Sequence, residues 1–169
     1  MSLDSLRVLA HPLRMRILSL LTGASLSAAE AARELGETQA NVSYHLRRLH
    51  EAGLVEVAEE VSIRGGKARR YRHDPDSGRR FTHQRPEEEQ LLAIALAEEL
   101  RRRTELRRAD PRSSMTDAEL WVDEATWGRI VEQVRELSAL LHKAAVPPRT
   151  PGTLRVSATI SLFVMDQDR

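Results

Sequence analysis

Hydrophobic positions in the first third of the chain recur at helical spacing and predict three short helices. The patterns place these helices at residues 12–22, 28–35 and 39–52. Each helix carries an apolar stripe at three- and four-residue spacing, which is the arrangement that buries one face against a core. Ser27 begins a capping-box pattern for the second helix. We expect the last two helices, joined at Gly36 by a short turn, to form a helix-turn-helix.

After Leu54 the hydrophobic period changes from about 3.6 residues to two, which predicts β-strands. The alternating apolar residues of the first strand are expected to share one face: Val55, Val57, Val61 and Ile63. Gly65-Gly66 predicts a hairpin turn, and residues 69–73 the returning strand. Helices followed by a hairpin in this order are typical of a winged helix-turn-helix, which we expect to occupy residues 1–75.

The rest of the chain is predicted to contain a linker, a long helix and a strand-helix-strand tail. Residues 76–86 contain proline, glycine and aspartate and show no periodic pattern of hydrophobic residues, which predicts a linker. The helix at 87–108 has acidic residues at its start and arginines at its end, which suits the helix dipole. Alternating segments at 118–122 and 154–164 flank a helix that Asp123 caps. The predicted fold class is therefore α+β, and mainly α.

Composition and charge narrow the classes of protein. With 41% hydrophobic and 30% charged residues among 169, the chain can bury a core. It contains no cysteine, which excludes disulfides, thiolate metal sites and cysteine nucleophiles. Without a signal-peptide pattern or an apolar run long enough to span a membrane, we expect a cytoplasmic protein. The net charge is only +1, but the basic cluster from Arg64 to Arg72 is typical of contact with phosphate.

The residues placed to contact DNA lie on the third helix and on the hairpin. A recognition helix presents its outward N-terminal face to base edges in the major groove. Asparagine and glutamine pair with adenine, whereas arginine suits phosphate. The candidate DNA contacts on the helix are Thr38, Gln39, Ala40, Asn41, Ser43, Tyr44, Arg47 and Arg48, and those on the hairpin are Arg64, Lys67, Arg69, Arg70 and Arg72. The alternative interpretation is that both sets form only a solvated polar surface.

The same region resembles the ArsR-type winged helix-turn-helix regulators. The residues that carry the resemblance are LAHPLRMRIL at 9–18, QANVSYHL at 39–46 and LHEAGLV at 49–55. The resemblance covers about the first 73 residues, and the remainder is similar to the C-terminal dimerisation region of such regulators only loosely. It implies a homodimeric repressor that binds an operator with two-fold symmetry, its half-sites about one helical turn apart.

Neither a metal site nor a catalytic site is predicted. Metal-sensing members of the ArsR type use a cysteine pair, or a carboxylate and histidine site in a C-terminal helix. This chain has no cysteine, and His45 and His50, which share a helix, lie five residues apart and so on different faces. Motifs of nucleotide-binding loops, zinc proteases and α/β-hydrolases are absent. We therefore expect no metal, no cofactor and no enzyme activity.

Residues 87–169 are expected to serve dimerisation and the binding of an effector. The apolar patch of the long helix is the candidate dimer interface, with packing on the N-terminal domain as the alternative: Leu91, Leu92, Ala95, Leu96 and Leu100. Large residues of the tail are candidates for a ligand pocket or, alternatively, for core: Trp121, Trp127, Phe163 and Met165. The sequence thus predicts a sequence-specific transcriptional regulator, with double-stranded DNA, a second copy and a small-molecule effector as partners. A winged-helix module that binds protein is the alternative function.

Overall fold

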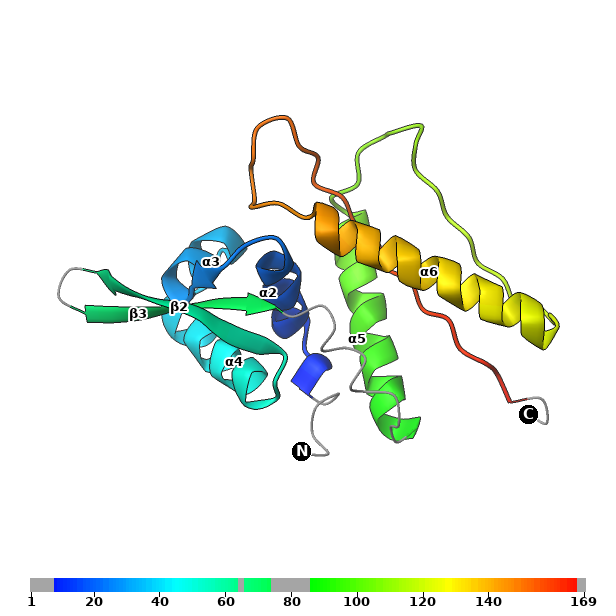
Figure 1. The fold of residues 1–169 in the computed structure, drawn as a ribbon, viewed down its shortest axis with the longest axis horizontal. Coiled ribbons are helices and arrows are strands. Elements are labelled where there is room, and N and C mark those ends of the chain that lie inside the picture. The colour runs from blue at the N-terminus through cyan, green and yellow to red at the C-terminus, as the bar shows by residue number, and fades with distance from the viewer. Residues whose placement is uncertain (1–7, 64–65, 74–85, 167–169) are drawn as a thin grey trace.

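The chain forms a helical N-terminal domain with a three-stranded sheet, followed by two long helices. The computed structural model describes residues 8–63, 66–73 and 86–166 (Figure 1). Along the chain the elements are α2 (Pro12–Thr22), β1 (Leu26–Ser27), α3 (Ala28–Leu35), α4 (Gln39–Glu51), β2 (Val55–Ile63), β3 (Gly66–His73), α5 (Pro86–Thr104) and α6 (Glu124–Ala144). Helix, turn, helix and hairpin follow one another in the order that the sequence predicts.

Local hydrogen bonds explain where the N-terminal helices begin and end. The backbone N–H of Leu13 donates to Nδ1 of His11, which caps α2. The predicted capping box of α3 is confirmed: the N–H of Glu30 donates to Oγ of Ser27, and the N–H of Ser27 donates to the Glu30 carboxylate. Gly36 ends α3 at a φ of 69°, a left-handed conformation that glycine adopts without strain.

One hydrophobic cluster joins α2, α3 and α4 to the sheet. Its most deeply buried members are Ile17, Leu21, Ala31, Val42, Leu46, Leu49 and Leu54. Burying one large aliphatic side chain of this kind stabilises the fold by roughly 1.5–3 kcal/mol. The cluster therefore fixes the relative positions of the two helices of the helix-turn-helix, and with them the outward face of α4.

The wing is an antiparallel hairpin of β2 and β3, and the short strand β1 pairs with the other side of β3. Ile63 pairs with Gly66 at the far end of the hairpin. Gly66 therefore belongs to β3, and the prediction that it is part of the turn is wrong. Arg64 and Gly65, and the predicted linker apart from Pro86, lie outside the described residues.

One irregularity in β2 reverses the side of the sheet that its residues face. Val57 pairs with Tyr71 and Val61 pairs with Ala68, because the register shifts between Val57 and Glu59. Directly paired residues point to the same side of a sheet, whereas residues an odd number apart on one strand point to opposite sides. Val57 and Val61 therefore lie on opposite sides. The prediction that the alternating residues of this strand share one face is wrong.

In the C-terminal half, α5 packs against α2 and α6 lies beyond α5 (Figure 1). The helix predicted after Asp123 is confirmed as α6, and α5 ends at Thr104, earlier than predicted. The strands predicted at 118–122 and 154–164 are not formed: the structure shows both segments as exposed chain without strand pairing. A strand needs a neighbouring edge for its backbone N–H and C=O groups, and the described part of the chain brings none beside these segments. In a single chain, the prediction of a strand-helix-strand tail is therefore confirmed for the helix and wrong for both strands.

Candidate nucleic-acid interface

Helix α4 buries one face in the core and presents the other to solvent. Its buried residues are Val42, His45, Leu46 and Leu49. The candidate contacts lie on the other face, where Ser43 is half-buried and the rest are exposed: Thr38, Gln39, Ala40, Asn41, Tyr44, Arg47 and Arg48. Oγ1 of Thr38 is already used as a helix cap, because it accepts the backbone N–H of Asn41 at 3.2 Å. Farther along the helix, Arg48 is paired with Glu51, because its Nη1 lies 3.3 Å from Oε2 of that residue.

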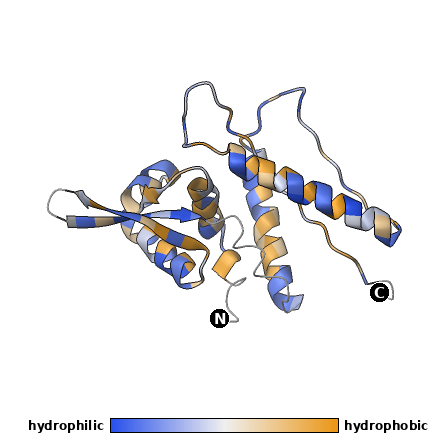
Figure 2. Ribbon diagram, viewed as in Figure 1, coloured by the Kyte–Doolittle hydropathy of each residue, from blue (hydrophilic) through white to orange (hydrophobic). Residues whose placement is uncertain are grey.

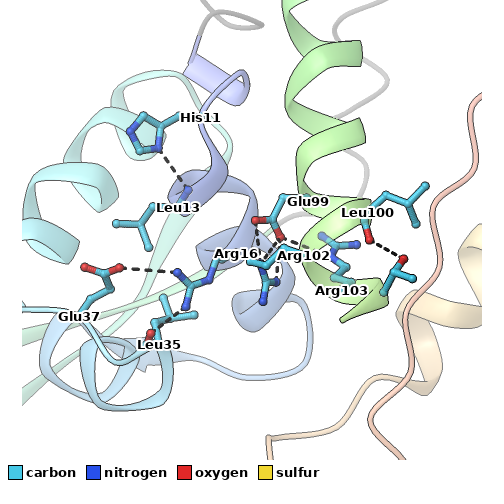
Figure 3. A network of polar contacts seen from close by, with 10 residues as sticks. His11, Leu13, Arg16, Leu35, Glu37, Glu99, Leu100, Arg102 and Arg103 are labelled. Carbon is cyan, nitrogen blue, oxygen red and sulfur yellow. Dashed lines mark hydrogen bonds and ion pairs between the residues drawn. The ribbon is translucent and has the colours of Figure 1, made fainter. Parts of the chain in front are cut away.

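The turn before α4 holds the side chain of Asn41. Its Nδ2 donates to Oε2 of Glu37 at 3.1 Å. Nη1 of Arg16 on α2 lies 3.6 Å from the other Glu37 oxygen, and Nη2 of Arg16 donates to the carbonyl of Leu35 at 2.7 Å (Figure 3). Neither Glu37 nor Arg16 is among the site residues predicted from the sequence. The four-residue spacing of Glu37 and Asn41 is the signal that indicates the first of these contacts.

A cluster of aromatic and cationic side chains lies between the start of α2 and the middle of α4. The rings of His11 and His45 are 4.5 Å apart, and Tyr44 meets His45 edge-on at 5.2 Å. Burial, followed by the charge of Arg14, lowers the pKa of His11, and burial also lowers the pKa of His45. Burial and the charge of Arg48 lower the pKa of Arg14. Arg14 thus adds a positive charge near Arg48, and it is not among the DNA contacts predicted from the sequence.

The arginines of the wing are paired with glutamates of the opposite strand. Three ion pairs follow the register of the hairpin: Arg72–Glu56, Arg70–Glu59 and Arg69–Glu60. Arg70 also lies 3.3 Å from Glu30 of α3. Such pairs neutralise the charges of three arginines that are predicted from the sequence to contact phosphate. Lys67 is exposed and forms no ion pair with the residues that the structure describes.

Glu99 is a buried carboxylate on the side of α5 that faces α2 (Figure 3). Glu99 is 1% exposed, accepts a hydrogen bond from Nη2 of Arg102 at 2.9 Å and lies 3.4 Å from Nε of Arg103. Burial opposes the ionisation of Glu99, but the hydrogen bond from Arg102 and the charges of Arg102, Arg103 and Arg16 outweigh it and lower its pKa. Figure 3 shows this network between α2 and α5. Arg16 therefore stands between Glu99 and Glu37.

The residues predicted for dimerisation and for a ligand pocket have different surroundings. On α5, Ala95 is buried, Leu92 and Leu96 are half-buried, and Leu91 and Leu100 are exposed. In the tail, Trp127 is half-buried, and Trp121, Phe163 and Met165 are exposed. A hollow on the surface of α5 is lined by Ala97, Leu100, Arg101, Thr104 and Glu105. It contains one of the dimerisation candidates and none of the four pocket candidates.

Neither a metal-binding group nor a membrane-spanning helix is found among the described residues. Within residues 8–63, 66–73 and 86–166, no group of three or more histidine and carboxylate side chains is placed to hold a metal ion. None of the helices in this part of the chain is both long and apolar enough to cross a membrane.

Comparison with known proteins agrees with the geometry of this region. Residues 9–58 match the family described as a helix-turn-helix domain. No curated protein matches the chain. The matched range runs from the residues just before α2 into β2, so it contains α4 and the contact between Glu37 and Asn41. The match supports a DNA-binding regulator, with DNA as its partner, over an enzyme.

Proposed function

We propose that this protein is a sequence-specific transcriptional regulator of the ArsR type, which represses a promoter as a homodimer. The observation that carries the proposal is the outward face of α4. The core holds Val42, His45, Leu46 and Leu49 on one side, so the polar residues on the other side project together from a fixed helix. This is the arrangement in which a helix-turn-helix reads the major groove.

The side chains on this face divide by chemistry. Gln39 and Asn41, in the first turn, are the proposed readers of base edges, since both can pair with adenine through two hydrogen bonds. Arg47 follows later in the helix and is proposed to contact phosphate. Arg48, with Arg14 beside it, is proposed to do the same by exchanging its ion pair with Glu51 for a phosphate. At the wing, exposed Lys67 takes the phosphate role, since Arg69, Arg70 and Arg72 are paired with glutamates. Ser43 and Tyr44 are proposed to reach either bases or phosphates.

Residues 1–75 form the proposed DNA-binding domain, 76–86 the linker, and 87–169 the region for dimerisation and an effector. Two copies related by a two-fold axis place two recognition helices in successive major grooves. The operator would then carry half-sites about one helical turn, or roughly 34–36 Å, apart. Repression follows because a dimer bound there blocks the promoter, and an effector acts through the C-terminal region.

The test is binding of the purified full chain to fluorescent DNA from its own promoter region, across a salt series and with unrelated DNA as competitor. We expect binding that resists the competitor and weakens as salt rises, because phosphate contacts release counterions. Asn41→Ala is expected to reduce the preference for promoter DNA while leaving the salt slope intact. Equal affinity of the unaltered protein for both DNAs, or no binding at low salt, contradicts the proposal.

The neutralised wing favours one second candidate, a winged-helix module that binds protein. Three of its arginines already face glutamates across the hairpin, so the wing offers less positive charge than its sequence indicates. In this candidate a protein partner covers the Arg47 side of α4. The same titration separates the two functions, because a protein-binding module has no salt-sensitive affinity for DNA of any sequence.

A further inference from the structure

The loop that follows α6 turns back to the N-terminal domain. Along α6, hydrophilic and hydrophobic residues are mixed, as Figure 2 shows in blue and orange, and none of its residues is fully buried. After this helix, the chain reaches α2 and α3 through residues 146–149, which belong to the orange loop in Figure 1. Two contacts attach these residues, one to Gly23 and one to Glu34. The C-terminal half therefore meets the helix-turn-helix at a second place, besides the packing of α5 on α2.

The contact at Gly23 depends on the absence of a side chain. A Cβ added to Gly23 would lie 2.6 Å from the carbonyl oxygen of Val146, which is too close for two nonbonded atoms. Gly23 ends α2 at a φ of −97° and a ψ of −7°, a conformation that other residues also adopt. Glycine is therefore needed at this position for space, because it lets the backbone of Val146 approach, and not for its conformational freedom.

The contact at Glu34 is an ion pair with a residue in a rare conformation. Nη2 of Arg149 lies 3.4 Å from Oε2 of Glu34 on α3. Arg149 has a φ of 64°, and it is the one residue other than glycine with a positive φ in the described part of the chain. A left-handed backbone is unfavourable for arginine and persists where surrounding contacts hold it. The ion pair with Glu34 is such a contact.

Glu34 lies beside the turn that leads into the recognition helix. The backbone N–H groups of Gly36 and Glu37 both donate to the carbonyl of Ala32, which closes this turn. Glu37 then accepts the side-chain amide of Asn41 at 3.1 Å. The buried residues of α3 are two alanines, so the core holds this short helix by little surface. A contact from outside the core therefore matters for the position of its end.

We infer that residues 146–149 form a strap through which the C-terminal region holds the end of α3, and with it the turn that places Asn41 against DNA. The inference rests on the proposed function, and it makes Arg149 a positioning residue that acts through Glu34. The strap begins just after α6, so a displacement of α6 withdraws the strap from α3. A signal in the C-terminal region thereby reaches the recognition helix within one chain.

Exchanging the two charges tests the ion pair. Arg149→Glu and Glu34→Arg each place like charges together, so hydrogen exchange at the amides of Gly36 and Glu37 should become about two- to fivefold faster. The preference of the full chain for promoter DNA over unrelated DNA should fall by a similar factor. The double variant restores the attraction and should return both quantities toward their original values. Unchanged exchange in both single variants, or no recovery in the double variant, overturns the inference.

Arg155→Glu is the matched control for charge, because Arg155 is exposed in the tail beyond the strap. It changes the net charge as much as Arg149→Glu does, and it should leave the exchange of the turn and the promoter preference unaltered. An effect of Arg155→Glu equal to that of Arg149→Glu overturns the inference, because net charge would then explain both.

Gly23→Ala tests the other contact of the strap. The added methyl group displaces the backbone of Val146, so exchange at the turn should become faster and the promoter preference should fall. Gly128→Ala, on α6, is the matched control, because a Cβ there has no neighbouring atom within 4 Å. Circular dichroism shows that each variant is folded. Equal behaviour of Gly23→Ala and Gly128→Ala overturns the inference.

Hydrogen exchange needs no DNA, so it separates failure of the strap from failure of the proposed function. If exchange follows the expected pattern but the unaltered chain does not distinguish its promoter from unrelated DNA, the strap is supported and the proposed function is overturned. If the unaltered chain prefers its promoter and the variants change neither quantity, the strap is overturned and DNA recognition stands. Faster exchange with an unchanged promoter preference overturns the positioning role of Arg149.

Discussion

The side-chain amide of Asn41 donates a hydrogen bond to the carboxylate of Glu37 across 3.1 Å. The bond joins the proposed base-reading residue to the turn of the helix-turn-helix. It holds the amide in one position, but it also places a negative charge beside the surface proposed to meet phosphates. Glu37 therefore positions Asn41 and at the same time opposes the approach of DNA.

Removing the charge of Glu37 is expected to strengthen DNA binding. Glu37→Gln keeps an oxygen that can accept from Asn41 but removes the repulsion of phosphate, so affinity should rise about threefold, or roughly 0.7 kcal/mol, for promoter and unrelated DNA alike. Fluorescence anisotropy at low salt measures both affinities. Glu119→Gln in the exposed tail is the control for net charge. Weaker or unchanged binding of Glu37→Gln would show that the carboxylate does not face the DNA.

Two substitutions in the wing are expected to separate phosphate contact from hairpin structure. Lys67→Ala should weaken binding to all sequences and lower the salt slope by about the contribution of one phosphate. Arg70→Ala removes ion pairs with Glu30 and Glu59, so it should lower stability by less than about 1 kcal/mol and leave the slope nearly unchanged. Salt titration and thermal unfolding of both variants measure these effects. The reverse pattern would assign the phosphate contact to Arg70.

Glu99 is expected to be the carboxylate on α5 that matters most for stability. Glu99→Gln leaves Arg102 and Arg103 without the buried charge that they contact, and should lower the free energy of unfolding by about 1–3 kcal/mol in urea. The neighbouring Glu98 pairs with Arg101 in solvent, so Glu98→Gln should change stability little. Equal effects of the two substitutions would mean that the contact of α5 with the N-terminal domain does not depend on this network.

Acid is expected to destabilise the N-terminal domain through His11 and His45. Burial, together with the charge of Arg14, lowers the pKa of both rings, and the opposite effect of Glu37 on His45 is smaller. Below the ordinary histidine pKa of about 6.5, the unfolded chain binds protons that the folded chain does not. The free energy of unfolding should therefore be highest above that pH and should decrease as the pH falls toward the lowered pKa values of the two histidines.

Urea unfolding between about pH 5 and pH 8 measures this loss, and His11→Asn is the informative variant. Asparagine can still accept the N–H of Leu13 as a helix cap, but it does not take up a proton. Its stability should vary less with pH than that of the unaltered chain. The same dependence in both proteins would exclude His11 as a source of the effect.

The N-terminal helices could be predicted because the signals that fix them are local. The capping box of Ser27 and Glu30 and the cap at Thr38 act within one turn of each helix, so the sequence carries their whole geometry. The helix-turn-helix at residues 9–58 and the outward face of α4 were predictable on the same basis.

The errors arise where distant parts of the chain must meet. The alternation of apolar and polar residues at 154–164 shows which side chains would lie on the same face of a strand. It does not show whether the edge of another strand lies close enough to pair with it. In the wing, one register shift after Val57 decides that Arg70 faces Glu59, and nothing in the sequence marks that shift. The burial of Glu99 likewise depends on how α5 meets α2, and an acidic residue in a helix ordinarily indicates a solvated face.

Because no residue of α6 is fully buried within a single chain, the proposed homodimer makes the concentration of this protein important for its function. If two chains complete the C-terminal half for each other, dilution alone separates them, and the midpoint of thermal unfolding rises with concentration. The amount of dimer then follows the square of the amount of free chain. Near the dissociation constant, a cell that halves its supply of the chain loses more than half of its assembled regulator, so expression level itself sets a threshold for action at the promoter.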